Sequence, residues 1–225
     1  ALLVDIDNAV KSLVKAKTFG NEDVAKSIDA LNLRNNPEFF LWHTRFNDVL
    51  SNKKDKKGKT IKGSGGFDIV IGNPPYVNVE LMSPESKVRY KDLFKCFYKR
   101  SDMFALFMEQ SLVHLANKNG IVTLIIPSVS HSNSSYVPLR NLMLNNHWLS
   151  EVCYTGGDVF PAPTVDTTIL RCNKSGNKTI TLKHAVNFAN PRVSVVDSDY
   201  FSAFSNIISI SNNGEDSLFS KLFNK

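Results

Sequence analysis

The chain has 225 residues, of which 42% are hydrophobic and 21% are charged, and its formal net charge is +6. This length can bury one α/β core, and the charge permits a polyanionic partner without requiring one. Cys96, Cys153 and Cys172 form no CxxC pair and join no His/Cys cluster, which fits a reducing cytoplasm and argues against a disulfide scaffold or a metal site. The five histidines are scattered, and solvated or capping roles fit them better than ligation. No apolar run approaches the length of a membrane span, so we expect no membrane partner.

Residues 1–50 are predicted to be a helical segment that leads into the main domain. Apolar residues recur at helical spacing over 2–17, and Asn21 is placed to cap a second helix. Residues 39–50 repeat the helical spacing with aromatic side chains on one face. A loop rich in Lys, Gly and Ser follows over 51–66.

The most informative run is FDIVIGNPPY at residues 67–76. Its apolar, β-branched beginning predicts a buried strand that stops at Gly72. Pro74 and Pro75 have a fixed φ and no N–H, so they place Asn73 on a stiff loop at the carboxyl end of that strand. Ligands bind at this end of the strands in open α/β sheets. The asparagine, the proline carbonyls and the tyrosine that follows could together hold a planar amino group.

Helices and buried strands alternate after this loop. The remaining elements are predicted to be a helix near 84–94, a helix that Ser101 caps and that runs through Asn117 with Gly120 at the C-cap, a strand over 121–126, a helix over 135–146, a strand over 149–154, and a hairpin of strands 165–172 and 178–183. This order predicts an α/β fold with a mostly parallel sheet and an antiparallel edge hairpin. The pattern weakens after the hairpin, so we expect 67–185 to form the core and 186–225 to connect to a following domain.

The tetrapeptide NPPY at residues 73–76, after a hydrophobic strand, resembles the catalytic loop of the S-adenosylmethionine-dependent amino-methyltransferases. Residues 39–50, 101–127 and 159–171 resemble further motifs, in the same order, of the large methylases of type IIG- and IIS-like restriction-modification systems. The resemblance spans roughly residues 39–175. It implies the C-terminal half of a Rossmann-like methyltransferase fold. It also implies methyl transfer from S-adenosylmethionine to N6 of a flipped adenine in double-stranded DNA.

The resemblance implies a role for individual side chains. The Asn73 oxygen and the Pro74 carbonyl would accept the two N6–H groups of adenine and aim the lone pair of N6 at the methyl group. Tyr76 and Phe160 would stack on the two faces of the flipped base. Positioning by these residues would replace a strong base.

Asp102 and Phe107 match the region that contacts the cofactor in this family. Each assignment has a structural alternative. Asp102 could cap a helix, and Phe107 could belong to the core. Asn73 could be an ordinary turn residue, while Tyr76 and Phe160 could serve loop or core packing.

Basic residues gather in two places. The lysines within residues 53–62 precede the strand of the tetrapeptide, so they lie opposite the catalytic loop and are interpreted as a solvated insertion. A second group follows the loop, is interleaved with aromatic residues and is a candidate for phosphate contact; it consists of Lys87, Arg89, Lys91, Lys95, Lys99 and Arg100.

No stretch before residue 67 offers the strand, Gly-rich turn and helix with which this family binds its cofactor. We therefore expect a fragment that lacks an upstream cofactor-binding half and a downstream target-recognition domain, and that is inactive or weak alone. The resemblance implies a cytoplasmic protein of a bacterium or an archaeon.

Three other functions stay open. A protein glutamine N5 methyltransferase would use a similar tetrapeptide, although residues 77–100 and the hairpin after Phe160 are foreign to those compact enzymes. A fragment that only positions DNA for a nuclease is disfavoured by the intact NPPY. Methylation of cytosine N4 is chemically possible, although those enzymes more often carry Ser or Thr at the position of Asn73.

Overall fold

The computed structural model describes three stretches of the chain, residues 46–157, 159–160 and 165–210. The chain divides into two units, Ala1–Ser51 and Asn52–Lys225. The described part of the first unit contains helix α4 (Asn47–Leu50). The helices predicted over 2–17 and from Asn21, and most of the helix predicted over 39–50, lie outside the described residues.

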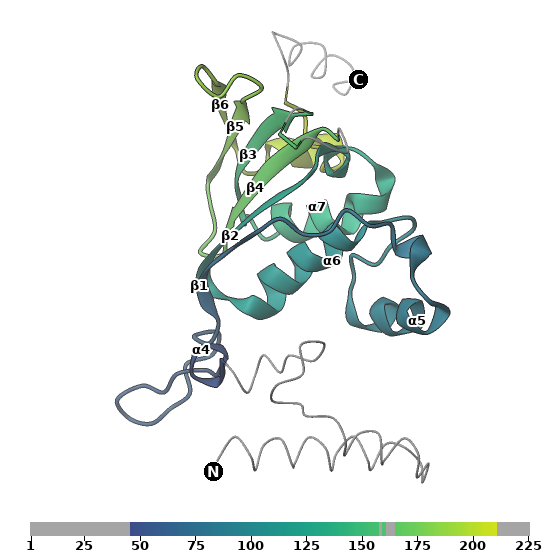
Figure 1. Ribbon diagram of the computed structural model, residues 1–225. Coiled ribbons are helices and arrows are strands. Elements are labelled where there is room, and N and C mark those ends of the chain that lie inside the picture. Colours follow the sequence, from purple (N-terminus) through teal and green to yellow (C-terminus); the bar gives the residue numbers. More distant parts are fainter. Residues whose placement is uncertain (1–45, 158, 161–164, 211–225) are drawn as a thin grey trace. The chain divides into compact units, whose positions relative to one another are not determined.

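The second unit is built on a six-stranded sheet with the order β1-β2-β4-β3-β5-β6 (Figure 1). The strands are β1 (Phe67–Gly72), β2 (Ala116–Pro127), β3 (Leu149–Gly156), β4 (Thr167–Asn173), β5 (Thr179–His184) and β6 (Arg192–Asp197). β1 pairs with β2 in parallel, and β3 pairs with β5 in parallel. β4 lies antiparallel between β2 and β3, and β6 is antiparallel to β5. The predicted α/β class is therefore confirmed, with β1, β2, β3 and β5 running in one direction.

The predicted hairpin is wrong, because β4 and β5 do not pair with each other. β3 lies between them, antiparallel to β4 and parallel to β5. The connection between Asn173 and Thr179 therefore passes over one strand, a span of about 10 Å at the usual strand spacing. A short polar loop can make either connection, so its composition does not reveal which strands are neighbours.

The sheet continues beyond residue 185, where we expected the core to end. β6 pairs with β5 along its whole length, and the 3-10 helix Tyr200–Phe204 follows. Phe201 and Ile208 are buried in the core. β6 itself leaves Val193 and Val195 exposed at the edge of the sheet. An edge strand with so few buried positions gives little alternation to recognise in the sequence.

Three of the predicted helices are present in the second unit: α5 (Pro84–Leu93), α6 (Met103–Gln110) and α7 (Val137–Leu144). The end predicted for α6 is wrong. A π-helical turn, Ser111–Leu115, leads straight into β2 at Ala116. Gly120 lies inside β2, where an added Cβ would stand 2.8 Å from the Phe67 carbonyl oxygen. The glycine is thus needed for close approach of β1 and does not end a helix.

The core lies between the sheet and the two helices α6 and α7, which contact each other and cover the same face (Figure 1). It includes Phe104, Met108, Leu139 and Met143 from the helices and Val122, Leu124, Val152 and Leu170 from the strands. The opposite side of β1 differs, since Ile69 and Ile71 are 66% and 77% exposed. β1 is an edge strand of the sheet, and the described residues of the second unit leave this apolar face exposed. No helix in the described part of the chain has the length and apolar character to cross a membrane.

Backbone contacts with the start of α6 hold the chain that leaves the tetrapeptide. The Met103 N–H donates to the Val77 carbonyl at 2.8 Å, and the Val79 N–H donates to the Ser101 carbonyl at 3.1 Å. Further along, the buried Glu109 carboxylate accepts the N–H groups of Lys95 and Cys96 at 3.0 and 2.8 Å. α6 therefore fixes both ends of the segment that carries α5.

Substitution of Glu109 tests whether this carboxylate anchors the segment after α5. Glu109→Gln keeps one side-chain oxygen, so one of the two backbone N–H groups loses its acceptor. We expect the free energy of unfolding, measured by denaturant titration, to fall by about 1–3 kcal/mol. Amide hydrogen exchange at Lys95 and Cys96 should quicken. Glu85→Gln, on the exposed first turn of α5, is the matched control and should change both little. Unchanged exchange at the two amides would contradict the anchoring role.

Candidate active site

The carboxyl ends of β1, β2 and β3 share one edge of the sheet, because these strands run in the same direction. The tetrapeptide follows β1, the 3-10 helix η3 (Ser128–His131) follows β2, and the loop that contains Phe160 follows β3. Ligands bind at such an edge in open α/β sheets. The sequence-predicted loop therefore lies where the chemistry of this fold class is expected.

Asn73 and the two prolines leave the sheet directly after Gly72, which still pairs with Leu124 of β2. The Asn73 side chain is exposed, Pro74 is buried and Pro75 is exposed. Among the described residues, neither the Asn73 side chain nor the Pro74 carbonyl has a hydrogen-bond partner. An asparagine that served only as a turn residue would commonly bond its own backbone, as Asn78 does with the N–H of Glu80. The exposed Asn73 amide is therefore available to a ligand, and no described group competes for the Pro74 carbonyl.

Tyr76 fastens the end of the tetrapeptide to the body of the unit. Its hydroxyl donates to the Ile125 carbonyl of β2 at 3.1 Å, and its ring meets Phe104 of α6 edge-on with 6.3 Å between the ring centroids. The side chain is half-buried, and this burial raises the pKa of its phenol. Tyr76 thus packs against the core, and base stacking by its ring stays a prediction.

Phe160 is half-buried on the loop that joins β3 and β4. It shares this edge of the sheet with the tetrapeptide. The structure shows no ring contact or hydrogen bond between Phe160 and Tyr76 among the described residues. Its stacking role also stays a prediction.

Asp102 is the N-cap residue of α6, but its side chain makes no capping hydrogen bond. Its carboxylate accepts a 2.6 Å hydrogen bond from the hydroxyl of Tyr136. Burial, together with the hydrogen bond and negative charge of Asp102, raises the pKa of the Tyr136 phenol far above its usual range. The predicted cap, Ser101, precedes the N-cap position, and its hydroxyl accepts the N–H of Tyr98. The pair of Asp102 and Tyr136 joins the start of α6 to the start of α7.

Phe107 is 44% exposed on α6, so the alternative that it belongs to the core is wrong. It lies beside an apolar cavity of about 160 Å³ between the end of α5 and α6. The cavity is lined by Tyr90, Phe94, Met103, Leu106, Phe107 and Gln110. A large exposed aromatic beside such a cavity is suited to contact a planar apolar ligand.

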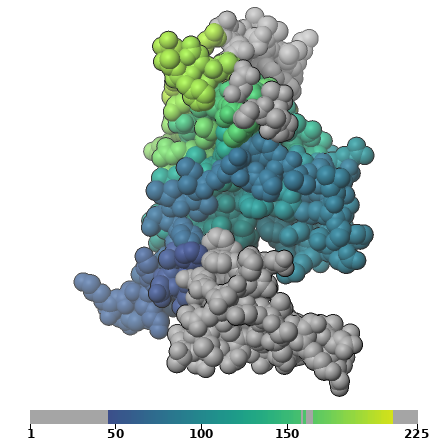
Figure 2. All heavy atoms as spheres, in the orientation of Figure 1, coloured from purple at the N-terminus to yellow at the C-terminus, as the bar shows by residue number. Residues whose placement is uncertain are grey.

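The basic residues after the loop are partly engaged within the protein. The Glu80 carboxylate accepts a hydrogen bond from the Arg100 guanidinium at 3.0 Å. The Glu80 backbone carbonyl accepts one from the Lys87 ammonium at 2.7 Å. The side chains of Arg89, Lys91 and Lys95 are exposed and have no partner among the described residues. Figure 2 shows the segment that carries them, in blue, spread over a broad area of the surface.

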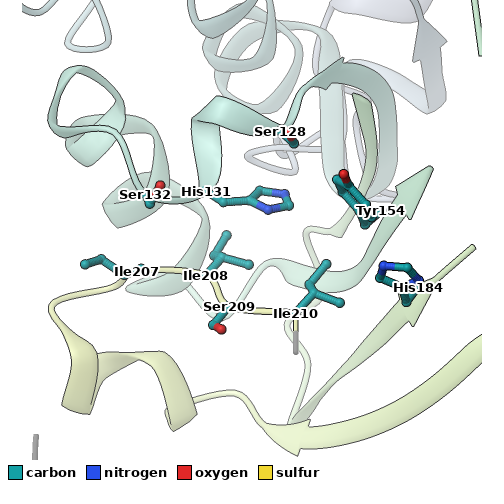
Figure 3. A pocket seen from close by; sticks show the side chains of 9 residues that line it. All are labelled: Ser128, His131, Ser132, Tyr154, His184, Ile207, Ile208, Ser209 and Ile210. Atoms are coloured by element: carbon teal, nitrogen blue, oxygen red, sulfur yellow. The ribbon is translucent and has the colours of Figure 1, made fainter. Parts of the chain in front are cut away.

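The sequence did not reveal a second cavity, of about 400 Å³, which lies at the carboxyl ends of the strands (Figure 3). It is lined by Ser128, His131, Ser132, Tyr154, His184 and residues 207–210. Scattered histidines suggested solvated roles, yet His131 is only 9% exposed and its ring points toward Tyr154 (Figure 3). Among the histidines that the structure describes, burial distinguishes His131 from the others. Among the described residues, no group of three or more His, Cys, Asp or Glu side chains is placed to hold a metal ion.

Burial lowers the pKa of His131 to about 4, and the nearby positive charge of Arg140 adds to this effect. Arg140 is 2% exposed, and its Nη1 donates to the carbonyls of Ser130 and Asn133, both at 2.9 Å. Burial also lowers the pKa of this guanidinium. At neutral pH the cavity therefore presents an uncharged imidazole.

This shift gives the stability of the protein a pH dependence. The unfolded chain binds a proton at His131 near pH 6.5, whereas the folded chain binds it only near pH 4, so acid favours unfolding between these values. Stability that is present above pH 6.5 should fall by about 3 kcal/mol on the way to pH 4 because of this residue. The free energy of unfolding of His131→Leu, measured by denaturant titration at several pH values, should lack this part of the pH dependence. That of the exposed His114→Gln should keep it. An equal slope in both variants would contradict the burial of a neutral His131.

Comparison with known proteins places the chain in a family. Residues 3–160 match the family described as Eco57I restriction-modification methylase. The chain is 30% identical over 126 residues to the type II restriction enzyme and methyltransferase RM.Eco57I of Escherichia coli, covering 54% of this chain and 12% of that protein. It is 30% identical over 117 residues to the type II methyltransferase M.TthHB8I of Thermus thermophilus, covering 49% of this chain and 27% of that protein. The chain thus spans well under a third of either relative.

A solved structure of a type I R-M system resembles the fold with a TM-score of 0.53 at 13% identity, over 71% of this chain and 42% of that one. This likeness concerns the fold alone and agrees with the predicted Rossmann-like α/β class. The family match covers most of the chain and confirms the resemblance to restriction-modification methylases that the NPPY loop and its flanking motifs indicated. The chain belongs to the Eco57I restriction-modification methylase family.

Proposed function

We propose that the protein transfers a methyl group from S-adenosylmethionine to N6 of an adenine flipped out of double-stranded DNA, in a restriction-modification or phage-defence system. The observation that carries this proposal is the pair of free acceptors after β1. The exposed Asn73 amide and the Pro74 carbonyl lack partners among the described residues, on a loop that Tyr76 fastens to β2.

The substrate explains why two acceptors are needed. The N6 lone pair of adenine is delocalised into the ring, so the amine is a weak nucleophile. Asn73 and Pro74 would each accept one N6–H, which draws N6 toward tetrahedral geometry and localises the lone pair on the side of the methyl donor. S-adenosylmethionine supplies the methyl group on a sulfonium, a good leaving group. No strong base is required, which agrees with the absence of a charged side chain from residues 73–76.

The target base must leave the duplex, at a free-energy cost of a few kcal/mol. Aromatic stacking of about 1–3 kcal/mol per base would offset part of this cost. We assign one stacking face to Tyr76 and the other to Phe160. The bond from the Tyr76 hydroxyl to Ile125 supports this, because a ring held in place loses little entropy when a base stacks on it.

Phe107 and Asp102 are the residues of this chain that we propose hold the cofactor. Phe107 is suited to contact a planar ring, since it is exposed beside an apolar cavity. The Asp102 carboxylate already accepts from Tyr136, and its remaining lone pairs can accept from a ligand. The rest of the cofactor site would come from a part of the protein upstream of β1.

Several exposed features support further partners. Ile69 and Ile71 on the free edge strand would be covered by the upstream cofactor-binding half. Arg89, Lys91 and Lys95 would contact DNA phosphates. A downstream domain would recognise the target sequence. The three cysteines are free and buried, which suits the reducing cytoplasm in which we place the protein.

Asn73→Ala tests the catalytic assignment in the full-length protein. Removal of one of the two acceptors should lower methyl transfer from labelled S-adenosylmethionine to unmethylated DNA by about 10²-fold or more. DNA affinity, measured by fluorescence anisotropy, should stay unchanged. Asn119→Ala, exposed at the start of β2, is the matched control and should methylate normally. Turnover by Asn73→Ala close to that of the unchanged protein would remove Asn73 from the mechanism.

Phe160→Ala tests the second stacking face. With 2-aminopurine in place of the target adenine, the unchanged protein should raise the fluorescence of the probe when the base leaves the stack. The variant should lose most of this rise, because about 1–3 kcal/mol of stacking is removed. Phe188→Ala, at an exposed phenylalanine outside this loop, should retain it. An equal rise in both variants would argue against stacking by Phe160.

A further inference from the structure

The cavity beside η3 is a site that methyl transfer leaves unused. We call it the His131 pocket, and its lining residues are Ser128, His131, Ser132, Tyr154, His184 and 207–210. Its walls come from η3 after β2, the ends of β3 and β5, and the segment after the helix Tyr200–Phe204 (Figure 3). The Ile208 N–H donates to the His131 carbonyl at 3.0 Å and holds this segment against η3.

The buried imidazole at the centre of the pocket has an unmet hydrogen bond. His131 Nε2 is shielded from solvent and has no partner among the described residues. Arg140 fixes the surrounding turn through the carbonyls of Ser130 and Asn133, so the imidazole is held in place. Nε2 has almost no accessible surface, so a ligand in the pocket does not reach it. The accessible edge of the imidazole lines the pocket, has no hydrogen-bond partner among the described residues, and can bond the polar edge of a ligand.

An aromatic wall lies on the other side of the pocket. The rings of Tyr154 and His184 are 5.2 Å apart, with an angle of 38° between their planes. The Tyr154 hydroxyl donates to the Asp166 carboxylate at 2.9 Å, which holds the ring in position. A fixed pair of rings gives a planar ligand a surface on which to stack.

The chemistry of the walls selects the class of ligand. The His131 pKa near 4 leaves the imidazole uncharged at neutral pH, so it would hydrogen-bond a neutral group better than it would attract an anion. Serine hydroxyls add donors and acceptors, and Ile207, Ile208 and Ile210 add apolar surface. The cavity of about 400 Å³ can admit a nucleobase. A flat, uncharged heteroaromatic ring with polar edges fits all of these features.

The position of the pocket connects it to DNA. It opens on the sheet edge that carries the tetrapeptide, and the Ser128 N–H donates to the Asp166 carbonyl at 2.8 Å. Asp166 ends the loop that contains Phe160. One loop thus joins the pocket to the proposed stacking residue for the target base.

We propose that the His131 pocket binds a second unpaired nucleobase of the DNA, distinct from the base presented to Asn73. The base stacks on Tyr154 and His184, and its polar edge bonds the accessible edge of the His131 imidazole. This inference rests on the proposed function for the identity of DNA as the partner. A second captured base would hold the duplex open beside the target.

Photocrosslinking tests the proposal with the full-length protein. DNA carries 5-iododeoxyuridine at unpaired positions near the methylated site, and peptides are mapped by mass spectrometry. We expect crosslinks at Tyr154 or His184. His131→Leu and His184→Ala should each lower both the crosslinking yield and the affinity for DNA with an unpaired base by about five- to tenfold. An abasic nucleotide at the same position should weaken binding to the unchanged protein by a similar factor and abolish the difference between variants.

His114→Gln, at an exposed histidine outside the pocket, is the matched control and should crosslink normally. Crosslinks confined to the tetrapeptide and the Phe160 loop would overturn the proposal. So would free thymidine binding the pocket as tightly as the unpaired DNA, since the site would then serve a small molecule. Crosslinks at Tyr154 without any methyl transfer to DNA would support the pocket and reject the proposed function. Methyl transfer without these crosslinks would reject the pocket alone.

Discussion

The end of strand β1 is the constraint on which the rest of the site depends. Gly72 still pairs with β2, but Pro74 and Pro75 have no N–H and cannot continue the ladder. The chain must leave the sheet there, and Tyr76 fastens it again through the Ile125 carbonyl. Between these two fixed points the Asn73 amide and the Pro74 carbonyl keep their hydrogen-bonding capacity for a ligand. A rigid backbone with free acceptors is what orientation of an amino group requires.

Helix α6 holds the surroundings of this loop in place. Its first residues pair with the backbone after the tetrapeptide, Asp102 bonds Tyr136 at the start of α7, and Glu109 binds two amides after α5. Phe104 lies under Tyr76, whereas Phe107 faces outward. One short helix thus connects the proposed base site, the proposed cofactor contact and the basic segment around α5.

Local sequence signals predicted the strand before NPPY, helices α6 and α7, and the α/β class, because each rests on an apolar pattern or on proline chemistry. Helix α5 was also predicted, although none of its residues is buried. The neighbour of each strand was harder to predict. The polar loop after Asn173 looks like a hairpin, but β3 occupies the place between β4 and β5. β6 was missed because its valines are exposed at an edge. At the site, residues 73–76 could be found from their type and order, whereas the buried state of His131 depends on Arg140 and on residues far away in the chain.

The central claim is that N6 of adenine is the methylated atom. The most direct measurement is to incubate the full-length protein with unmethylated DNA and labelled S-adenosylmethionine, digest the DNA and separate its nucleosides by mass spectrometry. The proposed function predicts labelled N6-methyladenine, with the amino group held by the acceptors at Asn73 and Pro74. Label in N4-methylcytosine, or label found only in protein added to the reaction, would contradict the claim.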